Sequence, residues 1–235
     1  MSKTAIKEPS IVDDFMYGSN VATAHITIRM GFLRKVYGIL TSQLLLTSLV
    51  GFIFMMHEGI KNFVQTNNWM MFVALFGTLA IMFPLMLKRQ ETPTNYILLA
   101  AFTLMEAYTV GVVVTMYDKL VVLEAVVLTL GVTAALTVYT LQSKRDFSSW
   151  GAGLFACLWV LILAMILQIF FPTELIDKAI SVGGALLFSL FIVFDTYMMM
   201  HKLSPEEYML AAINLYLDIL NLFLHILRIL GDRRN

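Results

Sequence analysis

Charged residues are scarce in this sequence. Asp, Glu, Lys and Arg make up 14% of its 235 residues, whereas 59% are hydrophobic; a typical soluble domain has about 25% charged residues. A soluble chain of this length cannot bury so many apolar side chains, but a bilayer accepts them on the outer face of every helix. The formal net charge is zero, so we expect no nucleic-acid partner.

Cysteine and catalytic signatures are also nearly or wholly missing. The single cysteine, Cys157, excludes an intramolecular disulfide and a zinc cluster. The sequence has no Gly-x-Ser-x-Gly, His-Glu-x-x-His or Walker motif. The Gly-x-Gly-Asp signature of intramembrane aspartyl proteases is missing around the two aspartates discussed below. We therefore expect a membrane protein that is not an enzyme and has no cofactor.

Seven stretches are long and apolar enough to cross a bilayer, for which a helix needs about 20 mostly apolar residues. They are residues 36–56, 69–87, 93–117, 120–143, 147–173, 179–200 and 208–227. The connections are short and the last stretch is the most polar, which indicates a helix lined by protein. We predict an all-α integral membrane domain over residues 36–235, a seven-helix bundle whose last helix is enclosed by the other six. Small residues near 151–153 and 183–185 favour close helix packing.

Basic residues gather on one side of the predicted bundle, which places the amino terminus in the cytosol. Near the helix ends on this side are Arg29, Arg34, Lys35, Lys88, Arg89, Lys144, Arg145 and Lys202. On the other side are Lys61, Lys119 and Lys178. If the last segment spans, Arg228, Arg233 and Arg234 also emerge there. A re-entrant last segment would return these three to the cytosol, so that alternative stays open.

The segment ahead of the first span, residues 21–36, is basic and amphipathic. This pattern is typical of a helix that lies on the membrane surface. It fits a cytosolic extension of the first span equally well. Residues 1–35 are therefore predicted as a cytosolic tail with a candidate interfacial helix.

Four carboxylates lie inside the predicted spans: Glu106, Glu124, Asp195 and Asp218. A charge at mid-bilayer costs about 3 kcal/mol or more, so each is a functional candidate. Asp195 lies about 10 Å of helix before Lys202, and Asp218 about 15 Å after Tyr208, at 1.5 Å per residue. The two aspartates therefore reach similar depth in a helical hairpin and can meet. Glu106 and Glu124 either line a pathway or bond to hydroxyl groups on neighbouring helices.

Two carboxyls in a poorly hydrated place cannot both ionise cheaply, so Asp195 and Asp218 are expected to share a proton. Ca²⁺ prefers oxygen ligands but takes about six to eight, of which two carboxylates supply at most four. We predict a proton sensor and a weak, transient Ca²⁺ site there. Lys88 or Arg89 is the candidate basic partner that would lock the pair. Alternatively, each aspartate bonds to helix backbone or to Asn221 and only fixes the packing.

Three further polar residues, Asn214, Asn221 and His225, lie on the last predicted span with Asp218. Asn221 is also a candidate for lining a pathway. We interpret His225 as a packing or interfacial residue rather than a proton sensor.

Several motifs resemble the transmembrane Bax-inhibitor-motif family, also called lifeguard. They are residues 201–208 (His-Lys-Leu-Ser-Pro-Glu-Glu-Tyr), residues 215–224 and Phe194-Asp195-Thr196. Residues 13–19, 28–37 and 137–147 resemble the Golgi-resident branch of the family. The resemblance runs from about residue 11 to the end of the chain.

The resemblance implies a seven-helix bundle in a Golgi or endoplasmic reticulum membrane, with the last helix surrounded by the other six. It implies a pH-sensitive Ca²⁺ leak from intracellular stores, with Asp195 and Asp218 as the paired aspartates, and suppression of apoptosis. The family's basic partner for the aspartates falls on Lys88 or Arg89. The expected partners are the lipid bilayer, Ca²⁺, protons, and membrane proteins of apoptosis or Ca²⁺ release. A non-conducting protein that modulates such partners is the rival, and a proton-coupled transporter is a third alternative.

Overall fold

The described part of the chain is built from helices, seven of which are long and apolar enough to cross a bilayer. The computed structural model describes residues 21, 24, 26–67 and 69–232. The seven are α2 (Ile26–Met56), α4 (Trp69–Leu87), α5 (Thr94–Val114), α6 (Lys119–Gln142), α7 (Gly151–Phe170), α8 (Glu174–His201) and α9 (Tyr208–Asp232). This confirms the predicted all-α, seven-helix architecture.

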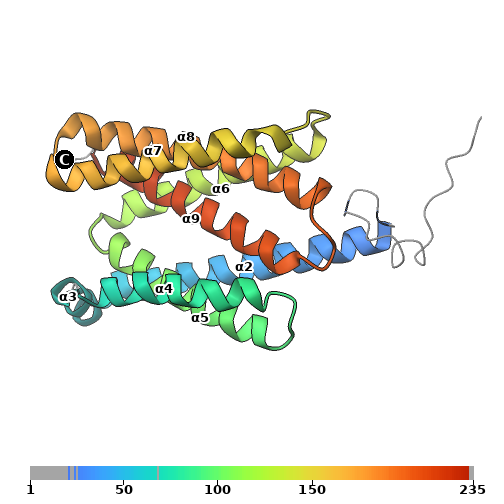
Figure 1. Cartoon of the computed structure of the whole chain (residues 1–235). Helices are drawn as coiled ribbons and strands as arrows, with labels where there is room; N and C mark the ends of the chain where they lie inside the picture. Colours follow the sequence, from blue (N-terminus) through green and yellow to red (C-terminus); the bar gives the residue numbers. More distant parts are fainter. Residues whose placement is uncertain (1–20, 22–23, 25, 68, 233–235) are drawn as a thin grey trace, which may run out of the picture.

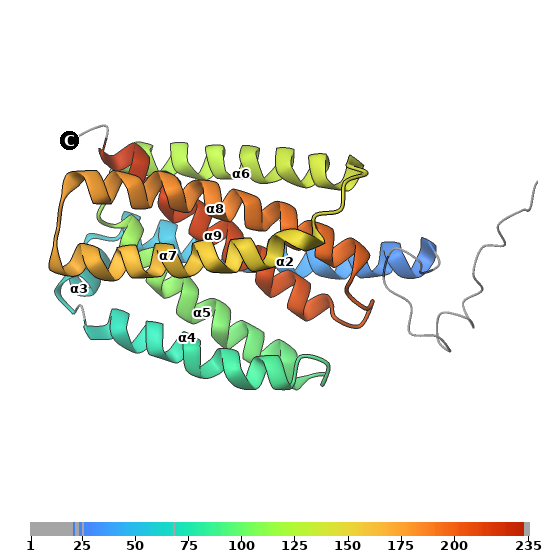
Figure 2. The ribbon, with the colours of Figure 1, turned by 45° about the horizontal axis from the view of Figure 1, so that its top comes forward.

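The last helix, α9, lies between two layers of helices (Figures 1 and 2). One layer holds α6, α7 and α8, and the other holds α2, α4 and α5. The most extensive contact of α9 is with α8, followed by α2 and α6. The outer helices α4 and α7 pack mainly on α5 and α8, respectively, so they contribute little to the contacts of α9. Of the seven spans, α9 is the most deeply buried.

The outer helices expose large apolar side chains along their length. On α4 these include Phe76 and Phe83, and on α7 they include Trp159 and Phe170, each more than half exposed. A helix that is apolar all round must be covered on every side, and here only lipid can cover the outer face. The described chain is therefore a membrane-embedded bundle.

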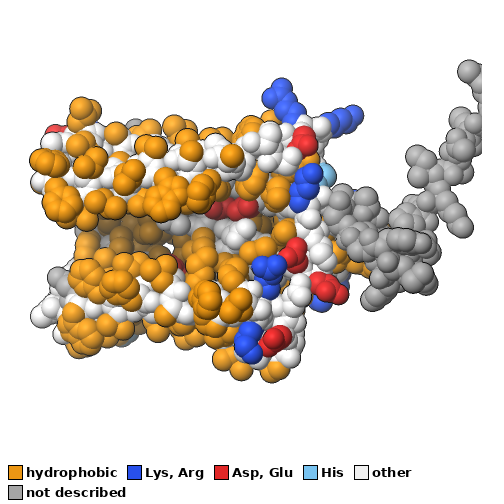
Figure 3. All heavy atoms as spheres, in the orientation of Figure 1, with side chains coloured by type: hydrophobic (Ala, Val, Ile, Leu, Met, Phe, Trp, Pro, Cys, Tyr) orange, Lys and Arg blue, Asp and Glu red, His pale blue; other side chains and the backbone are white. Residues whose placement is uncertain are grey.

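Charged side chains gather at one end of the bundle, which we call the basic face (Figure 3). This end holds the start of α2 and the loops at residues 88–93, 143–147 and 202–207. The opposite end is called the α3 face, because it holds the short helix α3 (Glu58–Thr66) and the loops at 115–118 and 171–173. Figure 3 also shows a hollow between the two layers with acidic atoms inside it.

The last helix crosses the bundle without a break. Its 25 residues span about 37 Å at 1.5 Å per residue, which exceeds the ~30 Å hydrocarbon core. The re-entrant hairpin is therefore wrong. Arg228 emerges at the α3 face as a spanning helix requires, but it forms an ion pair with Asp177 of α8, with Nε donating to Oδ2 at 3.1 Å. Arg233 and Arg234 lie outside the described residues.

The first span begins earlier than its apolar run. Helix α2 starts at Ile26, so the boundary predicted between residues 35 and 36 falls inside a continuous helix. Residues 26–35 extend the first span at the basic face instead of forming a separate helix. Ahead of α2, the Val21 amide donates to the Leu203 carbonyl at 3.1 Å. The predicted tail over residues 1–20 lies outside the described residues.

Two short elements are absent from the sequence-based prediction. They are α3 and a 3-10 turn at Ser148–Trp150. The nine-residue α3 is amphipathic: Val64 is buried, while Glu58 and Phe63 are exposed. Gln65 fixes α3 to the end of α5 by donating from Nε2 to the Thr115 carbonyl at 3.1 Å. A search for stretches of about 20 apolar residues cannot find elements of this length.

Candidate functional site

The α8–α9 hairpin brings Asp195 and Asp218 together. The short loop at 202–207 turns α8 back into α9, so the two helices pack antiparallel over their length. The carboxyl groups of Asp195 and Asp218 lie within hydrogen-bonding distance of each other. Asp218 is 6% exposed, and Asp195 is half-buried. The site is thus at the interface between the central helix and the helix that it contacts most extensively.

A hydrogen bond between two carboxyl groups requires a proton. An ionised carboxylate only accepts hydrogen bonds, so two ionised groups in contact have no donor between them. The second oxygen of Asp218, Oδ2, is buried and has no hydrogen-bond partner among the described residues. Burying such an atom without a partner is costly. A shared proton, a water molecule or a bound cation would each relieve this cost.

Asn214, which the sequence analysis did not select, contacts the pair. Its side chain hydrogen-bonds to Asp195. Asn214 lies four residues before Asp218, and this spacing puts both on one face of α9. The selected amide, Asn221, donates instead from Nδ2 to the Leu217 carbonyl of its own helix at 2.8 Å. In the sequence, this spacing makes Asn214 a candidate but does not distinguish it from Asn221.

Glu106 belongs to a different polar site, on the other side of α9. It lies near Thr78 and Tyr216. The Tyr216 hydroxyl lies 2.8 Å from Thr47 Oγ1 of α2. Tyr216 and Asp218 are two positions apart and so point about 200° apart around α9. The helix therefore separates Glu106 from the aspartate pair.

Glu124, the other glutamate selected from the sequence, is exposed on α6. It is five residues after Lys119, where α6 begins. This places Glu124 about 7.5 Å of helix from the α3 face at 1.5 Å per residue. The structure therefore does not bring it to the aspartate pair.

The candidate basic partners are both held by glutamates at the basic face. Arg89 Nη2 lies 2.8 Å from Glu207 Oε1, and Lys88 Nζ lies 3.0 Å from Glu91 Oε2. Glu207 precedes Asp218 by 11 residues, about 16 Å of helix. In the described part of the chain, neither Lys88 nor Arg89 forms an ion pair with the aspartates.

The Arg89–Glu207 pair closes the basic face above the aspartates. It joins the α4–α5 loop to the loop ahead of α9. Glu207 also accepts a hydrogen bond from the Ser204 amide at 3.3 Å. Next to it, the Lys35 ammonium of α2 lies 4.9 Å from the centre of the Tyr208 ring. These contacts tie the start of α9 to α2 and to the α4–α5 loop of the opposite layer.

The aspartate site offers few ligands for a metal ion. No cluster of three or more His, Cys, Asp or Glu side chains suited to a metal ion occurs within the described residues. Asp195, Asp218 and Asn214 supply at most four carboxylate oxygens and one amide oxygen. Ca²⁺ takes about six to eight oxygens, so water would have to complete its shell. Such a site suits an ion in transit better than one held for long.

These features define the class: a polytopic membrane protein whose central helix carries an intramembrane carboxyl pair. Residues 29–235 match the family model described as "Inhibitor of apoptosis-promoting Bax1". The chain therefore belongs to the Bax inhibitor family, as the motifs around Asp195 and Asp218 predict.

Curated relatives cover nearly the whole chain. It is 52% identical over 221 residues to Golgi anti-apoptotic protein of Vaccinia virus (strain Lister), covering 94% of this chain and 93% of that protein. It is 51% identical, with the same coverage, to Protein lifeguard 4 of Mus musculus. It is 44% identical to Bax inhibitor 1 of Schizosaccharomyces pombe (strain 972 / ATCC 24843), covering 100% of this chain and 88% of that protein.

Proposed function

We propose that this protein is a pH-sensitive Ca²⁺ leak channel of the Golgi membrane, or of the endoplasmic reticulum, that suppresses apoptosis by lowering store Ca²⁺. The observation that carries the leak function is the Asp195–Asp218 contact, with one buried oxygen lacking a partner. The names of the relatives support the anti-apoptotic role and the Golgi location. Ca²⁺ is the permeant ion, and we propose neither a resident cofactor nor a catalytic role.

The protonation state of the pair sets its attraction for Ca²⁺. With one proton the pair carries one negative charge, and without it the pair carries two. At an effective dielectric constant of about 20, a second negative charge about 4 Å from a cation strengthens the electrostatic attraction by several kcal/mol. Asn214 adds a neutral polar side chain next to Asp195. The pair therefore acts as both proton sensor and transient ion site.

We also infer that the basic face is cytosolic, with the α3 face toward the lumen. This follows from the excess of Lys and Arg near the helix ends at the basic face. Within the described residues, Arg228 at the α3 face has its charge compensated by Asp177. The Arg89–Glu207 pair then closes the cytosolic end of the pathway.

Flux from liposomes tests the leak function directly. Purified protein is reconstituted into liposomes loaded with Ca²⁺, and release is followed with a fluorescent indicator outside. We expect release well above that of protein-free liposomes. Release no faster than in protein-free liposomes, from protein that is correctly folded, would reject the channel.

The rival function is a non-conducting interaction protein, which the ion pairs that join neighbouring segments at the two ends favour. It would act on membrane proteins of cell death or Ca²⁺ release. It predicts no flux from liposomes, and full protection of cells by Asp195→Asn and Asp218→Asn variants. A proton-coupled transporter would instead move protons when a cation gradient is imposed.

Opening the basic face should increase the leak. Arg89→Gln removes the only charge that Glu207 contacts across the two loops in the described structure. A partly exposed ion pair of this kind is worth about 1 kcal/mol, so we expect Ca²⁺ release to rise about fivefold. Initial release rates from liposomes with matched protein content measure the effect.

Lys88→Gln is the matched control for Arg89→Gln. It removes the same charge one residue away, but the partner of Lys88, Glu91, lies in the same loop. The Lys88–Glu91 pair does not connect different segments of the bundle, so Ca²⁺ release should stay at the wild-type rate. Equal rates for the two variants would show that Arg89–Glu207 does not close the pathway.

A further inference from the structure

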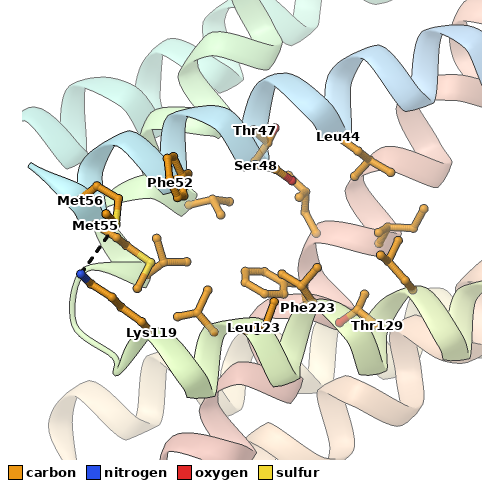
Figure 4. A pocket seen from close by; sticks show the side chains of 18 residues that line it. Leu44, Thr47, Ser48, Phe52, Met55, Met56, Lys119, Leu123, Thr129 and Phe223 are labelled. Atoms are coloured by element: carbon orange, nitrogen blue, oxygen red, sulfur yellow. Dashed lines mark hydrogen bonds between the residues drawn. The ribbon is translucent and has the colours of Figure 1, made fainter.

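A second site lies on the far side of α9 from the aspartates. A cavity of about 510 Å³ lies between α2, α5, α6 and α9. Its walls are almost wholly apolar and include Leu44, Phe52, Val114, Val126, Leu130 and Phe223. Its volume is within the ~300–1,000 Å³ of ligand-binding pockets. Figure 4 shows Lys119 beside Met55 and Met56 at one end, and Leu44 and Thr129 toward the other.

The length of this cavity matches one leaflet of a bilayer. Along α2 it is lined from Leu44 to Met56, about 18 Å of helix at 1.5 Å per residue. Along α6 it is lined from Lys119 to Leu130, about 16 Å by the same rise. Half of the ~30 Å hydrocarbon core is about 15 Å. The cavity thus has the length of an acyl chain in the leaflet at the α3 face.

A polar recess continues the cavity at the α3 face. This second cavity, of about 390 Å³, shares Met55 and Lys119 with the first and is also lined by Lys61, Tyr117 and Asp118. Two lysines against one aspartate leave it with a positive charge. It lies at the depth where the head groups of that leaflet begin.

Neither lysine of the recess forms an ion pair among the residues that the structure describes. The polar contact of Lys119 Nζ is with Met56 Sδ, at 3.7 Å. A thioether sulfur is a weak acceptor. By contrast, Lys178 on the same face pairs with Glu174. The ammonium groups of Lys61 and Lys119 are therefore available for an anionic ligand.

We propose that the two cavities together bind one anionic phospholipid from the leaflet at the α3 face. An acyl chain fills the apolar cavity, and Lys119 and Lys61 bind the phosphate. A fatty acid would leave the 390 Å³ recess largely empty, and a zwitterionic head group would bring a cation next to the two lysines. The bound chain lies against Ile219, Leu220 and Phe223 of α9.

Native mass spectrometry of the delipidated protein tests this proposal. Phosphatidylglycerol, phosphatidylcholine with the same chains, and stearate are added at equal concentrations. We expect one phosphatidylglycerol to bind at least about fivefold more tightly than phosphatidylcholine, since a lysine near a membrane surface contributes about that factor. Equal binding of the two phospholipids, or of stearate, would overturn the proposal.

Variants separate this site from lipid that merely surrounds the protein. Ser48→Phe places a ring in the cavity and should abolish specific binding. Its control is Ser42→Phe, on the same helix and equally exposed but outside the lining. Lys119→Gln should weaken phosphatidylglycerol binding about fivefold, and Lys178→Gln should leave it unchanged.

Both variant pairs have outcomes that would reject the site. Binding by Ser48→Phe equal to that of Ser42→Phe would identify the lipid as annular. If Ser48→Phe does not fold, the Lys119→Gln variant decides, because Lys119 is exposed. Unchanged binding by folded Lys119→Gln would overturn the head-group assignment.

Discussion

Asp218→Asn is expected to shift the pH profile of Ca²⁺ release from liposomes, and Asp195→Asn to do the same. Asparagine keeps the size of the side chain but cannot release a proton. The side chains of Asp195 and Asp218 are hydrogen-bonded, so replacing either one turns the coupled titration of two carboxyls into the titration of one. We expect wild-type release to change about tenfold across the titration, since losing one charge costs a bound cation more than about 1.4 kcal/mol. In each variant the midpoint of the profile should move by at least about one pH unit, because groups that titrate as a coupled pair interact by more than that.

The measurement is the initial release rate over a pH series between about pH 5 and pH 8, the range in which acidic pairs and histidines titrate in proteins. Asp146→Asn is the control. A side-chain hydrogen bond to Ser148, with a backbone hydrogen bond to the same residue, lowers the pKa of Asp146 to about 2. This exposed loop carboxylate stays ionised throughout the series, so its variant should keep the wild-type profile.

Two results would reject the assignment of the aspartate pair. Wild-type pH profiles in both Asn variants would place the proton sensor elsewhere. Wild-type flux in both would leave only the structural role, in which the aspartates fix the packing of α8 on α9. Loss of flux together with a lower melting temperature would also favour the structural role.

The meeting of Asp195 and Asp218 could be predicted because it depends on quantities local to the sequence. A short loop, two helices and a rise of 1.5 Å per residue fix the depth of each side chain. The same reasoning could not separate Asn214 from Asn221. Both lie near Asp218 on one helical face, four residues before it and three after. Only the position of α8 decides that Asn214 contacts Asp195 while Asn221 bonds to its own helix.

The partner of Arg89 could not be predicted, for a related reason. Arg89 and Glu207 are 118 positions apart and lie in loops whose meeting depends on how the two layers pack. Glu207 also accepts a hydrogen bond from the Ser204 amide, a local contact that gives no indication of Arg89. The cavity beside α6 could not be predicted from the sequence either, because the residues that line it belong to apolar stretches like those of any membrane-spanning helix.

Gly184→Ala is expected to destabilise the bundle, whereas Gly183→Ala should not. A Cβ at Gly184 would overlap the imidazole of His225, which packs from α9. The imidazole stacks on Phe188 at 5.7 Å between ring centres and is 8% exposed, so it has little room to move. At Gly183 a Cβ would meet nothing within 4 Å. Of the small residues predicted to favour close packing, Gly184 therefore has no room for a methyl group, whereas Gly183 has.

The expected cost of Gly184→Ala is that of overpacking a core, about 1–3 kcal/mol. For a chain of this size each kcal/mol lowers the melting temperature by about 2–4 °C, which a thermal melt in detergent can resolve. Gly183→Ala should leave the melting temperature unchanged or raise it, since alanine favours helix over glycine by up to about 1 kcal/mol.

The double variant Gly184→Ala/His225→Ala identifies the cause. If the overlap with the imidazole destabilises Gly184→Ala, then removing the ring makes the added methyl group harmless. The double variant should therefore lose less stability than the sum of the losses in the two single variants. Equal losses for Gly183→Ala and Gly184→Ala would contradict the close approach of α8 to α9 at His225. Since the same two helices carry Asp195 and Asp218, the loss in Gly184→Ala should come with a shifted pH profile of Ca²⁺ release, which Gly183→Ala should retain.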